Sequence, residues 1–179
     1  MTDASGLYSH RTERMFDPFF RWVEGSAASV WVNQSPSLFA FPGILAAHTI
    51  GLGLLAGLNS ALDLRLLGIG RSIPAAAFMR LLPVMWFGLW LNVLSGIALL
   101  IAYPTKALTN PLFYLKLGLI AVALALLRAM EGRVRRADPI SGATRMLAAA
   151  SLAAWAATIA AGRFLAYTCT RLTVDLRCR

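Results

Sequence analysis

The sequence predicts an all-α fold, a polytopic membrane four-helix bundle preceded by an amphipathic interfacial helix. Three observations predict it. The chain is 58% hydrophobic and only 14% charged, whereas an ordinary soluble domain carries about 25% charged residues. The charged residues are gathered in short segments between long uncharged runs, as expected when lipid is the main solvent. The alternating pattern of a transmembrane β-barrel is not visible, which leaves helices as the way to cross lipid.

The net charge of +9 does not indicate a nucleic-acid-binding protein. The arginines lie in short loops beside apolar runs, which is typical of the cytoplasmic loops of membrane proteins. We therefore expect the lipid bilayer, including anionic headgroups, to be the partner of these residues, and no nucleic acid.

Residues 1–16 form a polar N-terminal tail, and an amphipathic helix is expected over residues 17–34. Asp17 is expected as its N-cap and Pro18 as its first helical residue. Apolar side chains then recur at helical spacing: Phe19, Phe20, Val23, Ala27, Val30 and Trp31. The segment is too charged to cross a membrane and carries Trp22 and Trp31, so it is expected to lie in the interface. A disordered leader is the alternative.

The transmembrane domain is predicted over residues 38–168, and a C-terminal tail over residues 169–179. Four spans are expected at about residues 38–62, 81–103, 111–130 and 146–167. Each is close to the about 20 residues that cross the hydrocarbon core of a bilayer.

The distribution of arginines predicts the orientation of these spans. The loop after the first span carries Arg65, Arg71 and Arg80, and the loop after the third is equally basic: Arg133, Arg135, Arg136 and Arg145. The loop after the second span has only Lys106 and, beyond it, Lys116. The two basic loops are therefore expected in the cytoplasm and both termini outside, in a bacterial inner membrane.

Small residues predict close packing between the first two spans. Gly53 and Gly57 form a small-xxx-small pair in the first span, and Gly88, Asn92 and Ser95 lie on the second. Such residues allow two membrane helices to approach closely and to form hydrogen bonds.

The candidate ligand site lies in the outer half of the bundle. His48 falls inside the first span, and the antiparallel topology brings Lys116 and Arg163 to a similar depth, with Tyr114 and Tyr167 close to them. Ionisable residues inside a membrane are costly and usually face the bundle interior. A neutral histidine that joins two helices by hydrogen bonds is the alternative for His48.

No carboxylate in the spans is placed to neutralise these cations. Either Lys116 and Arg163 extend to the headgroups, or an anionic ligand lies between the helices. One candidate ligand is haem b, with His48 as the axial metal ligand and the two cations on the propionates. Met85, a five-coordinate haem or a haem shared by a dimer would then have to complete the site. A quinone is the other candidate.

Two further sets of residues are expected to have structural roles. Asn59, Asp63 and Arg65 cluster at the cytoplasmic end of the first span, where they suit helix capping and loop packing, with an ion or proton relay as the alternative. Cys169 and Cys178 can close a short disulfide loop in an oxidising compartment. No catalytic motif is present, so catalytic residues are not assigned.

Four segments resemble a bacterial family of uncharacterised four-helix membrane proteins: residues 41–48, 62–68 (LDLRLLG), 111–116 and 161–167 (AGRFLAY). The resemblance covers nearly the whole chain and implies a four-helix inner-membrane protein with an intramembrane histidine. A looser likeness connects the chain with four-helix b-type cytochromes and copper-resistance membrane proteins.

These observations lead to three hypotheses of function. The first is an accessory or electron-transfer component of the inner membrane with a ligand site around His48, Lys116 and Arg163. The second is a non-catalytic scaffold or subunit of a larger membrane complex or homo-oligomer. The third is a small transporter component, which is disfavoured because the spans show neither a buried acid nor a broken helix.

Overall fold

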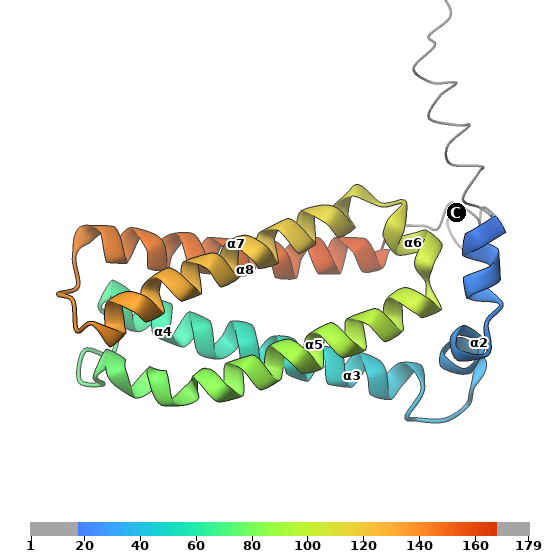
Figure 1. Ribbon diagram of the computed structural model, residues 1–179, viewed down its shortest axis with the longest axis horizontal. Helices are drawn as coiled ribbons and strands as arrows, with labels where there is room; N and C mark the ends of the chain where they lie inside the picture. The colour runs from blue at the N-terminus through green and yellow to red at the C-terminus, as the bar shows by residue number, and fades with distance from the viewer. Residues whose placement is uncertain (1–17, 168–179) are drawn as a thin grey trace, which may run out of the picture.

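The computed structural model describes residues 18–167, and these are almost entirely helical, with no strand among them (Figure 1). Four of its helices are long and apolar enough to cross a membrane. They confirm the predicted all-α fold and support a multi-pass membrane protein. The polar tails, Asp17 and the two cysteines lie outside the described residues.

The first span is Phe41–Leu67 and consists of α3 (Phe41–Leu52), a π-helical segment (Gly53–Gly57) and α4 (Leu58–Leu67). A 3-10 segment (Ala75–Leu81) leads into α5 (Leu82–Ala102), and together they form the second span. The third is α7 (Pro111–Arg135), and the fourth lies within α8 (Gly142–Tyr167). Two short helices, α2 (Ala27–Gln34) and α6 (Pro104–Leu108), complete the described part of the chain beyond a first helical stretch at 18–24.

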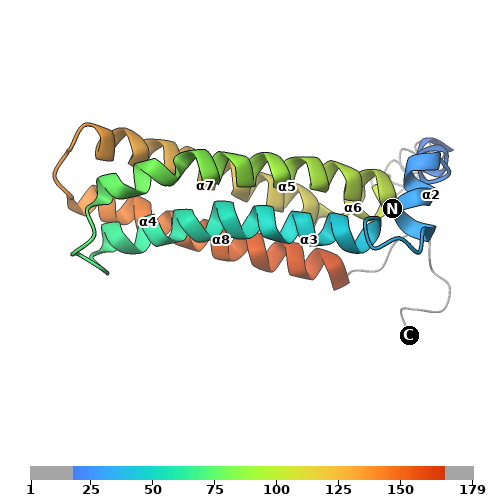
Figure 2. The ribbon, with the colours of Figure 1, turned by 90° about the horizontal axis from the view of Figure 1, so that it is seen from below.

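The four spans form two pairs. α3 packs along α5, and α7 packs along α8, while α4 packs against α8 and joins the two pairs. The loops 68–74 and 136–141 lie together at one end of the bundle, and α2 and α6 lie at the other (Figures 1 and 2). We call these ends the arginine-loop end and the α2 end.

The first span changes its partner at the π-helical segment. Before it, α3 faces α5, and after it, α4 faces α8. A π-helical turn holds more residues than an α-helical turn, so it rotates the face that the following residues present. Downstream of it, Asn59, Leu62, Asp63 and Leu66 are the buried residues of α4.

The crossing of α3 and α5 is closer than side chains would permit. A Cβ atom at Gly51 would lie 2.7 Å from the backbone N of Asn92, and one at Gly88 would lie 2.9 Å from the carbonyl O of Gly51. The predicted role of Gly53 and Gly57 as a small-xxx-small pair in this crossing is therefore wrong, because a Cβ atom added at either residue would meet open space. The residues predicted on the second span, Gly88, Asn92 and Ser95, are all buried.

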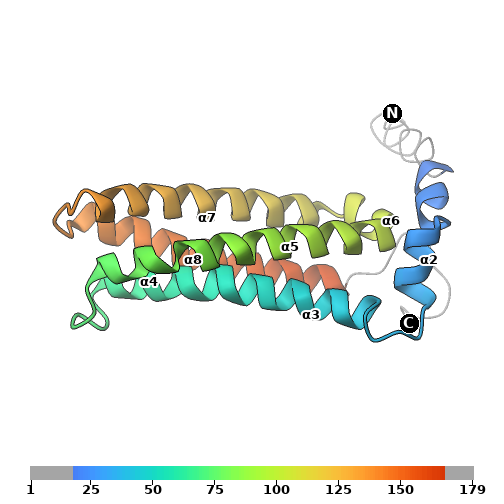
Figure 3. The same ribbon diagram turned by 60° about the horizontal axis from the view of Figure 1, so that its bottom comes forward.

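α2 lies across the end of the bundle (Figure 3). Its buried Ser29 donates a hydrogen bond to the carbonyl of Ala102 at 3.3 Å, and Asn33 donates to the same carbonyl at 2.9 Å. These bonds satisfy a carbonyl at the last turn of α5, where no intrahelical donor follows. The single helix expected over 17–34 is divided at Gly25, because the Ser26 side chain accepts from the backbone N–H of Ser29 and starts a second helix.

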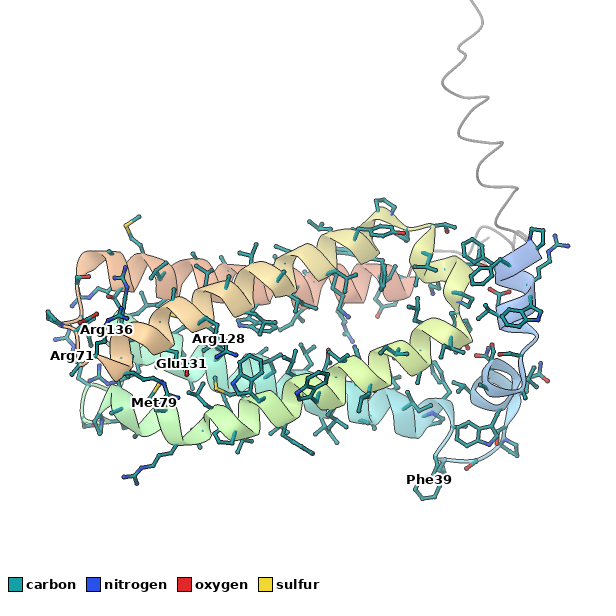
Figure 4. The ribbon with its side chains drawn as sticks, viewed as in Figure 1. Phe39, Arg71, Met79, Arg128, Glu131 and Arg136 are labelled. Carbon is teal, nitrogen blue, oxygen red and sulfur yellow. The ribbon has the colours of Figure 1, made fainter. Side chains whose placement is uncertain are left out.

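The arginine-loop end is tightly organised. Gly68, with φ of 109°, ends α4, and its N–H and that of Ile69 bond to the carbonyls of Arg65 and Leu64 in a Schellman motif. Arg65 donates to the carbonyls of Ile73 and Arg71 in the following loop. Figure 4 shows Arg71, Arg128, Glu131 and Arg136 gathered at this end.

Replacement of Gly51 by alanine tests the helix crossing. The added methyl group must push apart two backbones, so we expect Gly51→Ala to lower the unfolding free energy by about 1–3 kcal/mol. Gly53→Ala is the matched control and should leave stability unchanged or slightly raised, because its methyl group meets open space. Thermal unfolding in detergent measures both variants, and equal stabilities would contradict the crossing.

Candidate functional site

A cavity of about 510 Å³ lies between the two helix pairs, in the half of the bundle nearer the α2 end. Its walls are largely apolar and come from α3, α5, α6, α7 and α8, with Leu52, Leu89, Val93 and Ile120 among them. Cavities of about 300–1,000 Å³ with apolar walls and few polar groups are typical of small-molecule sites. The cavity forms here because α4 joins the helix pairs only toward the opposite end.

His48 is fixed in this cavity through one of its ring nitrogens. Its Nδ1 lies 3.1 Å from the carbonyl O of Asn92 and 3.1 Å from Oγ of Ser95. Since a carbonyl only accepts, Nδ1 carries the proton in the neutral ring, and Nε2 is left with a free lone pair. Among the described residues Nε2 has no hydrogen-bond partner. In return, Nδ2 of Asn92 donates to the His48 carbonyl at 2.8 Å.

Two glycines make room for the polar groups of the cavity. A Cβ atom at Gly96 would lie 3.3 Å from Cε1 of His48, and one at Gly162 would lie 3.6 Å from Nζ of Lys116. The ring of His48 therefore lies against α5, and the Lys116 side chain runs from α7 across the glycine of α8. The two residues line one cavity from opposite helix pairs.

Lys116 and Trp155 bring donors that the described residues do not use. Nζ of Lys116 forms neither a hydrogen bond nor an ion pair within residues 18–167. Nε1 of Trp155 is buried without a partner in the same part of the chain, and no acidic residue lines the cavity. A buried amide-like donor without a partner costs about 1–3 kcal/mol, and a charged group costs more. The cavity is therefore suited to a ligand that carries acceptor oxygens or negative charge.

The other residues predicted for this site lie outside the cavity lining. Arg163 and Tyr167 are exposed on α8, and Tyr114 is exposed on α7, where its hydroxyl donates to the carbonyl of Leu108 at 2.9 Å. Their positions suit side chains that extend to the membrane interface. Of the five predicted ligand-binding residues, the structure brings together His48 and Lys116. Met85 is buried in the core away from the cavity.

Sequence reasoning missed Trp155 and the α8 face that carries it. Ser151, Trp155, Thr158 and Gly162 are three or four residues apart and lie on one face of α8, a spacing that identifies an interior stripe. Lys106, predicted only as a loop residue, also lines the cavity.

A second polar cluster lies toward the arginine-loop end. Nδ2 of Asn59 donates to Oδ2 of Asp63 at 3.0 Å and to Oγ of Ser151 at 2.8 Å. All three side chains are fully buried, and Oδ1 of Asn59 and Oδ1 of Asp63 have no partner in the described chain. From the sequence, Asp63 is expected to cap the helix or contact the loop. Instead, it belongs to a buried cluster that joins α4 to α8 inside the bundle.

Residues 18–167 contain no group of three histidine, cysteine or acidic side chains that could hold a metal ion. No family model matches the chain, and no curated protein or solved structure matches it significantly. The class that the fold defines is a multi-pass, all-α membrane protein with a cavity between two helical hairpins.

Ser151→Ala tests the second cluster. The change leaves one N–H of the buried Asn59 amide without an acceptor. We expect a loss of about 0.6–1.7 kcal/mol of stability, from the average to the largest value found for hydrogen bonds between membrane helices. Ser60→Ala is the control, since Ser60 lies on the same helix as Asn59 and is less buried. Thermal unfolding in detergent compares them, and a Ser151→Ala protein as stable as the control would disprove the bond.

Proposed function

We propose that this protein is an accessory or electron-transfer component of a bacterial inner membrane that binds a quinone between its helices. One observation carries the proposal: His48 and Lys116 line the same apolar cavity, and neither Nε2 of His48 nor Nζ of Lys116 has a protein partner within the described chain. A quinone offers what these groups lack, because it combines an apolar ring with two oxygens on opposite edges.

The two polar groups suit the two oxygens differently. The Lys116 ammonium can only donate, so it suits a quinone carbonyl or a quinol oxygen. Nε2 of His48 can only accept in the neutral tautomer fixed by Asn92 and Ser95, so it suits the O–H of a quinol. Trp155 adds an N–H donor at the wall of the cavity. The reduced form of the ligand is therefore expected to bind with the full set of hydrogen bonds.

The route to the cavity is expected to be lateral. The two helix pairs are joined mainly where α4 packs on α8, and the cavity lies beyond that contact, between the pairs. Quinones dissolve in the hydrocarbon core, so a ligand that enters between α5 and α7 would not have to pass through a headgroup layer.

Haem b is the second candidate, and one observation favours it. A histidine whose Nδ1–H is bonded to a carbonyl presents Nε2 in the form that binds iron, which is the arrangement of His48 and Asn92. The cavity does not offer a second axial ligand of the usual kind, because its lining contains no histidine other than His48 and no methionine. The described residues therefore support a quinone better than a six-coordinate haem.

Quinone binding is tested with the detergent-purified protein. We expect a co-purifying quinone in organic extracts and binding of decylubiquinone by the wild type. Lys116→Met removes a charge-assisted bond of about 1.5–3 kcal/mol, so the dissociation constant should rise about 10-fold to 100-fold.

Arg163→Met is the matched control for this measurement. It removes a cation of similar depth that lies outside the cavity lining, so binding should not change. If the wild type neither retains quinone nor binds decylubiquinone, the proposal fails, and a scaffold in which His48 only joins α3 to α5 is favoured. A Soret band in the visible spectrum that is lost in His48→Ala would instead assign haem.

The orientation is proposed from the positions of the arginines. The loops 68–74 and 136–141 lie at the same end of the bundle, and basic loops of this length are retained in the cytoplasm. In a protein whose Cys169 and Cys178 are replaced by serine, a cysteine introduced by Ser72→Cys should then react with a membrane-impermeant maleimide only in inverted vesicles. A Thr109→Cys control in the same cysteine-free protein, between α6 and α7, should react only in right-side-out vesicles. The opposite pattern would reverse the orientation.

A further inference from the structure

Asp63 is a buried acid for which the described chain provides no positive charge. Its side chain is 0% exposed. Nδ2 of Asn59 donates to Oδ2 at 3.0 Å, and the hydroxyl of Ser151 also lies close enough to the carboxyl group to act as a donor. Its second oxygen, Oδ1, has no partner within residues 18–167. An ionised carboxylate in a low-dielectric interior requires a counter-charge, and the neutral amide of Asn59 and hydroxyl of Ser151 do not supply one.

The charged side chains of the elements around α4 have other contacts. On α4 itself Arg65 bonds to the loop, and on α7 Arg128 and Arg135 pair with Glu131 at 3.5 Å and 2.9 Å. Arg133 donates to Thr144 at 3.0 Å. The remaining cations of the packed elements are exposed or line the cavity in the other half, and these are Arg80, Lys116, Arg145 and Arg163.

From this arrangement we propose that Asp63, held by Asn59 and Ser151, is a proton-binding site inside the membrane. A proton supplies the missing charge without needing a void. It also makes Oδ2 of Asp63 a donor. This O–H can bond to Oδ1 of Asn59 if the side-chain amide of Asn59 is rotated by 180°, so that Oδ1 and Nδ2 exchange places. In that orientation Oδ1 of Asn59 also accepts a hydrogen bond from Ser151, because it takes the place of Nδ2, which lies 2.8 Å from Oγ of Ser151.

The site lies close to the cavity without being part of it. Asn59 and Ser151 each lie four residues from a lining residue of the cavity, Leu55 on the first span and Trp155 on α8. Four residues of helix correspond to about 6 Å of rise. The proton site is thus about one helical turn beyond the floor of the cavity, on its arginine-loop side. The proposal does not depend on which ligand the cavity binds.

Infrared spectroscopy of the protein in lipid vesicles tests the proposal directly. A protonated carboxyl group has a carbonyl stretching band that an ionised carboxylate lacks. Near neutral pH we expect this band in the wild type, a shift to lower frequency in D₂O, and loss of the band in Asp63→Asn. The asparagine is nearly isosteric with the neutral acid, so the variant should fold and keep its thermal stability.

Glu131→Gln is the matched control, because Glu131 is an acid of the same bundle end that is paired with two arginines. The band should persist in this variant. A wild type without the band, or with a band that Asp63→Asn does not remove, would overturn the proposal. So would a band that disappears when sodium chloride replaces choline chloride, because that result would assign the site to an alkali cation.

Carbodiimide labelling gives a second measurement. Dicyclohexylcarbodiimide is apolar and modifies protonated carboxyl groups, so mass spectrometry should find the adduct on Asp63 and not on Glu131. Labelling should decrease at alkaline pH as the carboxyl group loses its proton. An adduct on Glu131 but not on Asp63 would contradict the proposal.

Discussion

The contact between α4 and α8 determines the rest of the architecture. The first span packs on α5 along α3 and on α8 along α4, and the π-helical segment between them turns the interior face from one partner to the other. A regular helix would keep one face toward one neighbour. Because the two helix pairs are tied together through α4, they are closely packed at the arginine-loop end and enclose a cavity of about 510 Å³ toward the α2 end.

Polar groups in the two halves meet the low dielectric in different ways. In the cavity, one nitrogen of His48 is satisfied across α3 and α5, while Lys116 and Trp155 are left with unused donors. In the α4–α8 cluster, Asn59 and Ser151 bond to each other, while Asp63 is left with an unused acceptor and an uncompensated charge. The groups in the cavity would be satisfied by a ligand with several acceptor atoms, whereas the α4–α8 cluster would be satisfied by a positive charge. Unsatisfied buried groups of this kind are rare in native proteins, and each calls for an explanation such as strain, a bound ion or water, or a catalytic role.

Much of the fold could be predicted from the sequence because hydropathy and charge segregation act locally. The four spans follow from runs of apolar residues, and a contact of Arg65 with the loop could be predicted because this residue stands at the end of such a run. The shared cavity of His48 and Lys116 could be predicted in part, since antiparallel topology sets the depth of each residue. The direction in which Arg163, Tyr114 and Tyr167 face could not be predicted. The depth of a residue in the membrane does not say which side of its helix faces the bundle interior.

The sequence by itself determined that the chain is helical, that it has four apolar spans, and that its arginines gather in two loops, because each of these depends on neighbouring residues alone. Only the tertiary structure decided that Gly51, and not Gly53 or Gly57, lies at the helix crossing. It also decided that Asp63 is buried against α8 and not used as a cap. The physical reason is the π-helical segment: its extra residue changes the phase of the helix, and periodicity counted along the sequence cannot register that change.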